Sequence, residues 1–114
     1  MKKLIIAQIC LLSLISQIAS ADDLAKGQEI YKSTCITCHG GDYDGMGDAG
    51  KYMNPKPRNL KSDKFTNGDS AAQIFKTITE GFKEGSTGMV SFSKTLSETD
   101  RQAVAAFVVS LRKK

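Results

Sequence analysis

The sequence predicts an all-α fold with three main helices and long loops. Three segments carry apolar residues at helical spacing, and each begins at a residue type that caps helices. No segment alternates apolar and polar residues for long enough to make a secure strand. The segment 40–69, between the first two helices, holds both prolines of the chain and many of its glycines. An irregular segment of this length inside a compact domain usually has a functional role.

The first helix is expected from residue 23 to residue 33, with Asp22 or Asp23 as its N-cap. Four residues share one face of this helix: Leu24, Gly27, Ile30 and Tyr31. Glycine weakens a helix interior by about 1 kcal/mol relative to alanine. Close packing is therefore the best explanation for Gly27.

The second helix is expected from residue 70 to residue 80. Asp69 or Ser70 would cap its first turn, and Gly81 would end it by adopting a left-handed conformation.

The third helix has the clearest pattern and begins after Ser97. Ser97 and Asp100 resemble a capping box in which Asp replaces Glu. Apolar residues then recur at helical spacing: Val104, Phe107, Val108 and Leu111. The basic residues at the end of this helix favour the negative end of its dipole.

Cys35, Cys38 and His39 form the pattern Cys-x-x-Cys-His. On a helix, residues three and four positions apart lie about 5–6 Å from one another on one face. Two thiols placed in this way can form thioethers with the two vinyl groups on one edge of a porphyrin, while the adjacent imidazole binds the iron. The pattern predicts covalent attachment of one haem c, and it uses all three residues.

Other uses of these residues agree less well with the sequence. A structural zinc site needs four nitrogen or sulfur ligands, but the third cysteine, Cys10, lies in a segment expected to be removed, and His39 is the only histidine. A thioredoxin-like pair would need a βαβ context, and the sequence has no parallel-sheet pattern. With His39 assigned to iron, no histidine remains as a general base, so we expect that the protein is not an enzyme.

The first 21 residues have the features of a cleaved secretory signal peptide. Lys2 and Lys3 form a positive start, residues 4–18 are largely apolar, and residues 19–21 are an Ala-Ser-Ala cleavage site. The apolar stretch is shorter than the about 20 residues that span a bilayer. We expect a domain at residues 22–114, export to a periplasm, and no stable membrane insertion after the signal is removed.

The charge of the chain does not indicate nucleic-acid binding. The chain has 16 basic and 12 acidic residues, and removal of Lys2 and Lys3 with the signal leaves a net charge of +2. Two haem propionates would bring this charge to about zero. We therefore expect no nucleic acid among the partners.

Over residues 22–114 the chain resembles a class I cytochrome c. The resemblance implies the cytochrome c fold, in which the first and last helices cross beside one haem and long loops wrap around it. It also implies electron transfer between larger redox partners that act as donor and acceptor. The matching features occur in this order: Gly27 and Tyr31, Cys35-x-x-Cys38-His39-Gly40, a glycine-rich loop, Pro-Arg-Asn-Leu at Pro57 to Leu60, Gly88-Met89-x-x-Phe92, and Ala106-Phe107-Val108.

The sixth iron ligand, opposite His39, is expected to be Met89. Met46 and Met53 follow His39 by only seven and 14 residues, whereas Met89 follows it by 50 and has enough chain to reach the opposite face. Met89 also lies in the context of the family's ligand, although Val90 stands where the family commonly has proline. This departure favours a looser ligand loop.

Further residues are candidates for contacts around the haem. In this family a proline carbonyl commonly accepts the second ring N–H of the axial histidine, and Pro55 or Pro57 could do so. Arg58 could pair with a haem propionate, because its guanidinium matches a carboxylate, or it could be a solvated surface residue. Tyr52 and Asn59 are additional candidates for the propionates.

These observations predict a periplasmic one-electron carrier with a covalently attached haem c and His/Met axial ligation. Such ligation raises the reduction potential of the iron and fills its coordination positions. The alternative is a gas-binding or sensing haem c protein in which a small gas displaces Met89.

Overall fold

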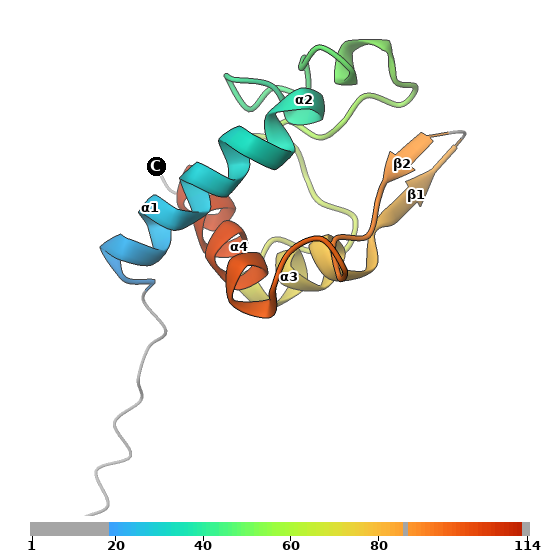
Figure 1. The fold of residues 1–114 in the computed structure, drawn as a ribbon. Coiled ribbons are helices and arrows are strands. Elements are labelled where there is room, and N and C mark those ends of the chain that lie inside the picture. Colours follow the sequence, from blue (N-terminus) through green and yellow to red (C-terminus); the bar gives the residue numbers. More distant parts are fainter. Residues whose placement is uncertain (1–18, 86, 113–114) are drawn as a thin grey trace, which may run out of the picture.

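Helices make up most of the regular structure in the computed structural model, which describes residues 19–85 and 87–112 (Figure 1). The longest of the described helices has 15 residues, and none of them is long and apolar enough to cross a bilayer. Residues 1–18 of the predicted signal peptide lie outside the described residues. The elements are α1 (Ala21–Ile30), the π-helical turn η1 (Tyr31–Cys35), α2 (Ile36–His39), the 3-10 turn η2 (Gly50–Tyr52), α3 (Ala71–Glu80), the strands β1 (Phe82–Glu84) and β2 (Thr87–Met89), and α4 (Glu98–Arg112).

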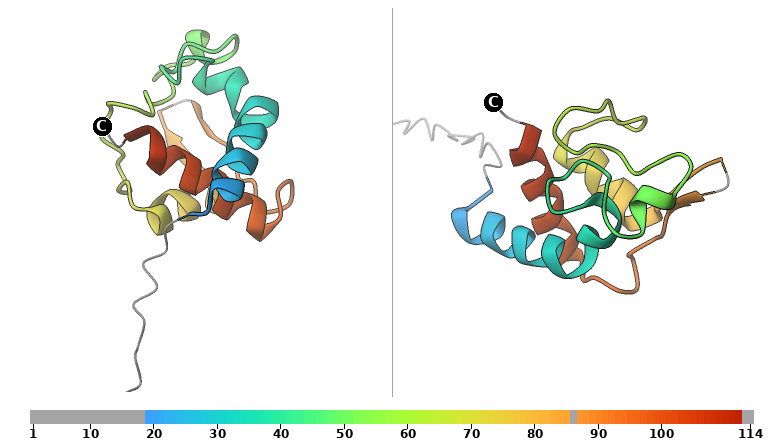
Figure 2. Two further views of the ribbon diagram at one scale, coloured as in Figure 1. Left: turned by 90° about the vertical axis from the view of Figure 1, so that its left-hand side faces the viewer. Right: turned by 90° about the horizontal axis from the view of Figure 1, so that it is seen from above.

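The first and last helices cross in close contact, as the resemblance implied (Figure 2). A Cβ atom at Gly27 would lie 2.2 Å from the carbonyl oxygen of Ala103 and 2.7 Å from Cβ of Phe107. Tyr31 and Val104 are the most deeply buried large side chains, each 1% exposed. The ring centroids of Tyr31 and Phe107 are 5.8 Å apart. The expectation that close packing explains Gly27 is confirmed, and the packing partner is α4.

The helix α1 begins two residues earlier than predicted, and its N-cap is neither Asp22 nor Asp23. The side chain of Ser20 accepts a hydrogen bond from the backbone N–H of Asp23, at 3.1 Å. The two aspartates instead lie in the first turn, where a negative charge favours the positive end of the helix dipole. Cleavage after residue 21 would remove the Ser20 cap and leave the aspartates at the start of the chain.

The N-terminal helix also continues past its predicted end at residue 33. The five residues of η1 add a π-helical turn, and α2 follows it directly as far as His39. Such turns carry one extra residue and occur often at functional sites. Nothing in the periodicity of the sequence indicates it.

The starts of α3 and α4 agree with the predictions. Ser70 caps α3 and forms a reciprocal capping box with Gln73. Gly81 ends α3 with a φ of +80°, a conformation that favours glycine. At α4 the hydroxyl of Ser97 accepts from the backbone N–H of Asp100 at 3.1 Å.

A short antiparallel hairpin, which the sequence analysis missed, follows α3. Its register pairs Phe82 with Met89, Lys83 with Gly88 and Glu84 with Thr87. Each strand has only three residues. This is too short for the alternation of apolar and polar residues that identifies a strand in a sequence. The hairpin adds to the three main helices without changing the helical character of the fold.

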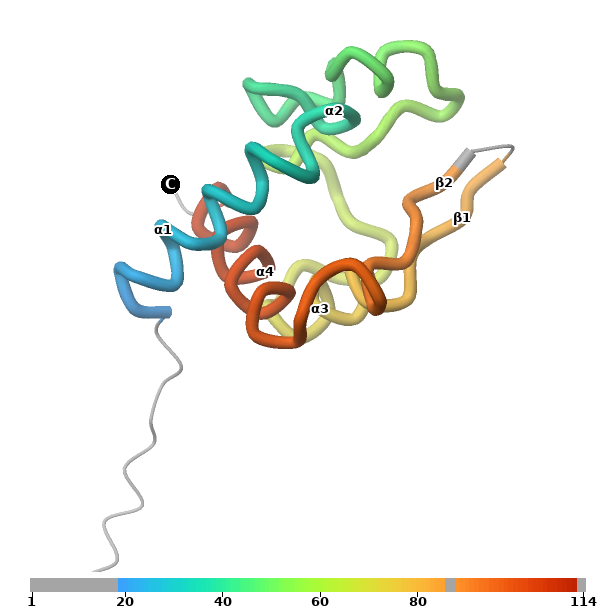
Figure 3. Tube along the Cα trace, in the orientation of Figure 1, coloured from blue at the N-terminus to red at the C-terminus, as the bar shows by residue number. Residues whose placement is uncertain are grey.

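The long loop between α2 and α3 is held to the end of α4 by Arg112. Figure 3 shows the loop running from α2 across the top of the molecule and down to α3. The guanidinium of Arg112 donates to the carbonyls of Leu60, at 2.9 Å, and Asp63, at 2.6 Å. It also pairs with Asp69 at 3.3 Å and lies 4.0 Å from the ring centre of Phe65. Arg112 therefore ties the loop down in addition to favouring the helix dipole.

We predict that Gly27→Ala destabilises the folded protein. Alanine would favour an isolated helix by about 1 kcal/mol, but the added methyl group meets backbone atoms of α4, and overpacking of this kind costs about 1–3 kcal/mol. Urea unfolding followed by far-UV circular dichroism measures the net effect. The control is Gln28→Ala, an exposed position on the same helix. If the two variants are equally stable, the crossing is not as tight as described.

Candidate haem-binding site

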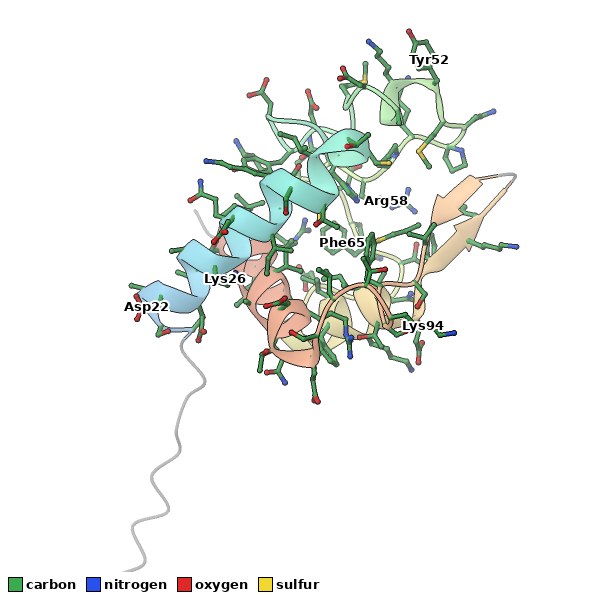
Figure 4. The ribbon with its side chains drawn as sticks, in the orientation of Figure 1. Asp22, Lys26, Tyr52, Arg58, Phe65 and Lys94 are labelled. Atoms are coloured by element: carbon green, nitrogen blue, oxygen red, sulfur yellow. The ribbon has the colours of Figure 1, made fainter. Side chains whose placement is uncertain are left out.

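A cavity with mostly apolar walls lies at the centre of the molecule, between the motif helix, the long loop, the hairpin and helices α3 and α4. Figure 4 shows Arg58 and Phe65 in this central region, between α2 with its loop and the part of the molecule that contains α3. Both residues line the cavity. The principal apolar residues of its walls are Leu60, Phe65, Ile74, Ile78, Phe82, Phe92, Val104 and Val108.

The three motif residues line one side of this cavity. Cys35 ends the π-helical turn, and Cys38 and His39 belong to α2. Both thiols are free and half-buried. Burial, followed by the neighbouring Cys38, raises the pKa of Cys35 to about 11, so this thiol keeps its proton at neutral pH. The helical turn thus brings two thiols and an imidazole to the same wall.

Backbone groups of the following loop satisfy the carbonyls at the end of α2. The carbonyls of Thr37, Cys38 and His39 accept from loop N–H groups at 2.9, 3.2 and 2.8 Å. A Cβ atom at Gly50 would lie 1.9 Å from the Cys38 carbonyl oxygen, which explains a glycine at this contact. The loop therefore holds the motif helix by its C-terminal end, where helix carbonyls otherwise lack partners.

The buried hydroxyl of Tyr31 donates a hydrogen bond to the carbonyl of Gly40, the residue that ends α2. Burial raises the pKa of Tyr31, so its hydroxyl remains a donor at physiological pH. The tyrosine ring also packs against Tyr43, with ring centroids 4.8 Å apart. Tyr31 thereby connects the helix crossing to the motif.

The ring of His39 is oriented by a backbone carbonyl. Its Nδ1 lies 3.1 Å from the carbonyl oxygen of Arg58. Burial lowers the pKa of His39, and the hydrogen bond to the Arg58 carbonyl opposes this shift only in part. The neutral ring donates from Nδ1, which leaves the lone pair of Nε2 for a metal ion.

The expectation that Pro55 or Pro57 supplies this carbonyl is wrong. The carbonyl oxygen of Pro57 lies 2.2 Å from where a Cβ of Gly45 would be, so it faces the loop. The next carbonyl, from Arg58, faces His39. Both prolines nevertheless line the cavity.

The side chain of Arg58 is ion-paired and not a freely solvated surface group. Its guanidinium lies 2.8 Å from the carboxylate of Glu84 and donates to the hydroxyl of Thr66 at 3.2 Å. Glu84, which is 26 residues from Arg58 in the chain, was not among the residues predicted from the sequence. No short motif could have indicated this pair.

Two of the methionines line the cavity. Met89 ends β2 and packs against the hydrophobic core. Met53 lines the cavity from the long loop but is not among the side chains that pack against the core. Met46 is 50% exposed and is not a lining residue. The structure therefore places Met89 at the same cavity as the motif. Met53 is the other methionine that could serve as the sixth iron ligand.

Tyr52 and Asn59, the additional candidates for propionate contacts, do not line the cavity. The side chain of Tyr52 is 81% exposed, with the Lys51 ammonium 5.3 Å from its ring centre. The side-chain oxygen of Asn59 accepts from the N–H groups of Lys61 and Ser62 in a local turn.

These residues fit a haem c. The two free thiols and the available Nε2 of His39 are the groups that covalent attachment and proximal ligation require. The walls are apolar where a porphyrin would pack. The polar side chains at the cavity include Arg58, Thr66 and Asn67, which carry donors for carboxylate groups, and Glu84, which pairs with Arg58.

Comparisons with known proteins agree with this site. Residues 22–108 match the family described as cytochrome c oxidase, cbb3-type, subunit III. A cytochrome c6 of Petalonia fascia is 29% identical over 92 residues, which cover 81% of this chain and 96% of that protein. A cytochrome c6 of Synechocystis sp. is 32% identical over 97 residues, which cover 84% of this chain and 72% of that protein.

Two longer proteins contain a similar region. The cbb3-type cytochrome c oxidase subunit FixP of Azorhizobium caulinodans is 34% identical over 92 residues, which are 76% of this chain but 29% of that protein. A chain of a reducing HAO-like protein complex of Kuenenia stuttgartiensis has a similar fold, with a TM-score of 0.67 and 25% identity. That match covers 82% of this chain and 46% of the other.

The predicted cytochrome c fold is thus confirmed by both the family match and the structural similarity. The two cysteines of the motif, in a chain of this family, imply covalent haem c as the cofactor. The chain therefore belongs to the family described as cytochrome c oxidase, cbb3-type, subunit III, as a monohaem c-type cytochrome that carries electrons and is not an enzyme.

Proposed function

We propose that this protein is a periplasmic one-electron carrier whose haem c has His39 and Met89 as axial ligands. One observation carries the proposal. A single, mostly apolar cavity is lined by Cys35, Cys38 and His39 from one segment and by Met89 from another, 50 residues further along the chain. The haem, when bound, supplies a reversible one-electron change at its iron.

The residues around the cavity have distinct tasks in this proposal. Cys35 and Cys38 hold the cofactor by two thioethers. The Arg58 carbonyl fixes the tautomer of His39 and increases its basicity as a ligand. The thioether sulfur of Met89 favours the reduced iron and raises the potential. The apolar walls would keep water away from a bound haem, which would limit solvent rearrangement when the charge of the group changes.

The periplasmic location and the partners are also part of the proposal. Residues 1–21 act as a cleaved signal peptide, so residues 22–114 enter the periplasm without stable membrane insertion. The partners are larger redox proteins that donate and accept the electron, and no nucleic acid is bound. One relative is named as a subunit of a cbb3-type oxidase, which makes a terminal oxidase a candidate class of acceptor.

The second candidate is a gas-binding or sensing haem c protein. Val90, which follows Met89, is 67% exposed, and the strand that carries Met89 has only three residues. A ligand held in this way is easier to displace. Carbon monoxide separates the candidates, because a carrier with a stable Met89 bond binds it poorly and a sensor binds it readily.

We predict that the haem is attached through both motif cysteines. The purified wild-type protein should gain the mass of one haem and keep it through acid–organic extraction. Cys35→Ala and Cys38→Ala should each leave one thioether and reduce the yield of holoprotein. Cys10→Ala is the matched control and should change nothing, because residue 10 lies in the predicted signal. Extraction of intact haem from the wild type would exclude a c-type attachment.

We predict that Met89, and not Met53, is the sixth ligand. The oxidised wild type should show the weak red absorption band of sulfur-to-iron charge transfer. Met89→Ala should abolish this band and open the iron to carbon monoxide, because the proposed sixth ligand is then missing. Met46→Ala should leave the band intact. Met53→Ala decides the matter: if it removes the band while Met89→Ala does not, the proposed ligation is incorrect.

A further inference from the structure

Arg58 contacts both sides of the cavity with different parts of the same residue. Its backbone carbonyl accepts from Nδ1 of His39, and its guanidinium pairs with Glu84 at 2.8 Å and donates to Thr66 at 3.2 Å. One residue therefore connects the imidazole to a carboxylate on the hairpin. Figure 4 shows Arg58 in the central region that this bridge spans.

Glu84 lies in the hairpin that carries Met89. It is the last residue of β1 and pairs with Thr87 at the start of β2, while Phe82 pairs with Met89 at the other end of the ladder. Each strand has three residues, so a displacement of Glu84 is transmitted through only three residue pairs. The position of Glu84 is therefore coupled to that of Met89.

The described side chains of this hairpin are at most half-buried. The side chains of Lys83 and Glu84 are exposed, and Phe82 and Met89 are half-buried. At the turn, a Cβ of Gly85 would lie 3.3 Å from Cδ of Pro55, so the hairpin tip lies close to the long loop. The Arg58–Glu84 pair is the only ion pair that joins the hairpin to the loop among the described residues.

We propose that the Arg58–Glu84 ion pair is a latch that holds the hairpin closed over the cavity and so protects the Met89 sulfur from displacement by other ligands. This inference rests on the proposed ligation by Met89. Opening the latch releases β1, and with it β2, while the carbonyl of Arg58 can still orient His39. Glu84 is thus a positioning residue for the sixth ligand.

The expected effect is modest because the pair is partly exposed. The side chains of Arg58 and Glu84 are 32% and 46% exposed, and ion pairs of this kind change an equilibrium by about two- to fivefold. Salt screens such a pair. Raising the ionic strength should therefore weaken the latch in the wild type.

The test measures the affinity of neutral imidazole for the oxidised haem protein, followed by loss of the sulfur-to-iron band. Imidazole binds only when Met89 has left the iron, so its affinity reports the fraction of open hairpin. Glu84→Gln, which keeps the shape and removes the charge, should raise this affinity about two- to fivefold. Added salt should raise the imidazole affinity of the wild type and leave that of Glu84→Gln unchanged.

The matched control is Asp69→Asn, which breaks the ion pair with Arg112 on another part of the long loop. It should leave the imidazole affinity unchanged even if it lowers stability. An unchanged affinity in Glu84→Gln, or an equal rise in Asp69→Asn, would overturn the latch. If the wild type itself lacks the sulfur band, the proposed ligation fails first and the latch fails with it, so the two failures are distinguishable.

Discussion

The close crossing of α1 and α4 is the constraint on which the rest of the structure depends. Gly27 allows the backbone of α1 to approach the Ala103 carbonyl, and this approach buries Tyr31 against Phe107. The Tyr31 hydroxyl then donates a hydrogen bond to the carbonyl of Gly40 and holds the end of α2. Val104 and Val108, from the same part of α4, form a wall of the cavity. The crossing thus positions the motif and the wall that it faces.

The long loop supplies backbone contacts that position the ligand residues on this helical frame. It covers the end of α2 with backbone hydrogen bonds, is tied to α4 by Arg112, and presents the Arg58 carbonyl to His39. Its irregular backbone allows these contacts in different directions. In a helix or a strand, the same backbone N–H and C=O groups would already be paired within the regular structure. The hairpin then brings Met89 to the cavity from the other part of the chain.

The parts of the fold that could be predicted from sequence are those with local causes. Apolar spacing located the three main helices, and the Cys-x-x-Cys-His spacing identified the motif. Capping residues marked two helix starts: Ser97 for α4, and Asp69 or Ser70 for α3, of which Ser70 is the cap. The hairpin could not be predicted because its strands are too short to show the alternation of apolar and polar residues. The Arg58 carbonyl and Glu84 could not be found for another reason: which way a carbonyl faces, and which charges meet across 26 residues, are consequences of tertiary packing.

We propose that His39 and Met89 bind one iron from opposite sides. Proton NMR of the reduced protein, with methionine methyl groups labelled with carbon-13, tests it most directly. The methyl group of an axial methionine lies over the porphyrin, and the ring current shifts its resonance far upfield. The account predicts one such resonance, with nuclear Overhauser contacts to residues beside Met89 in the chain. An upfield methyl in contact with Asn54 and Pro55 would instead identify Met53, and the absence of any upfield methyl would contradict methionine ligation.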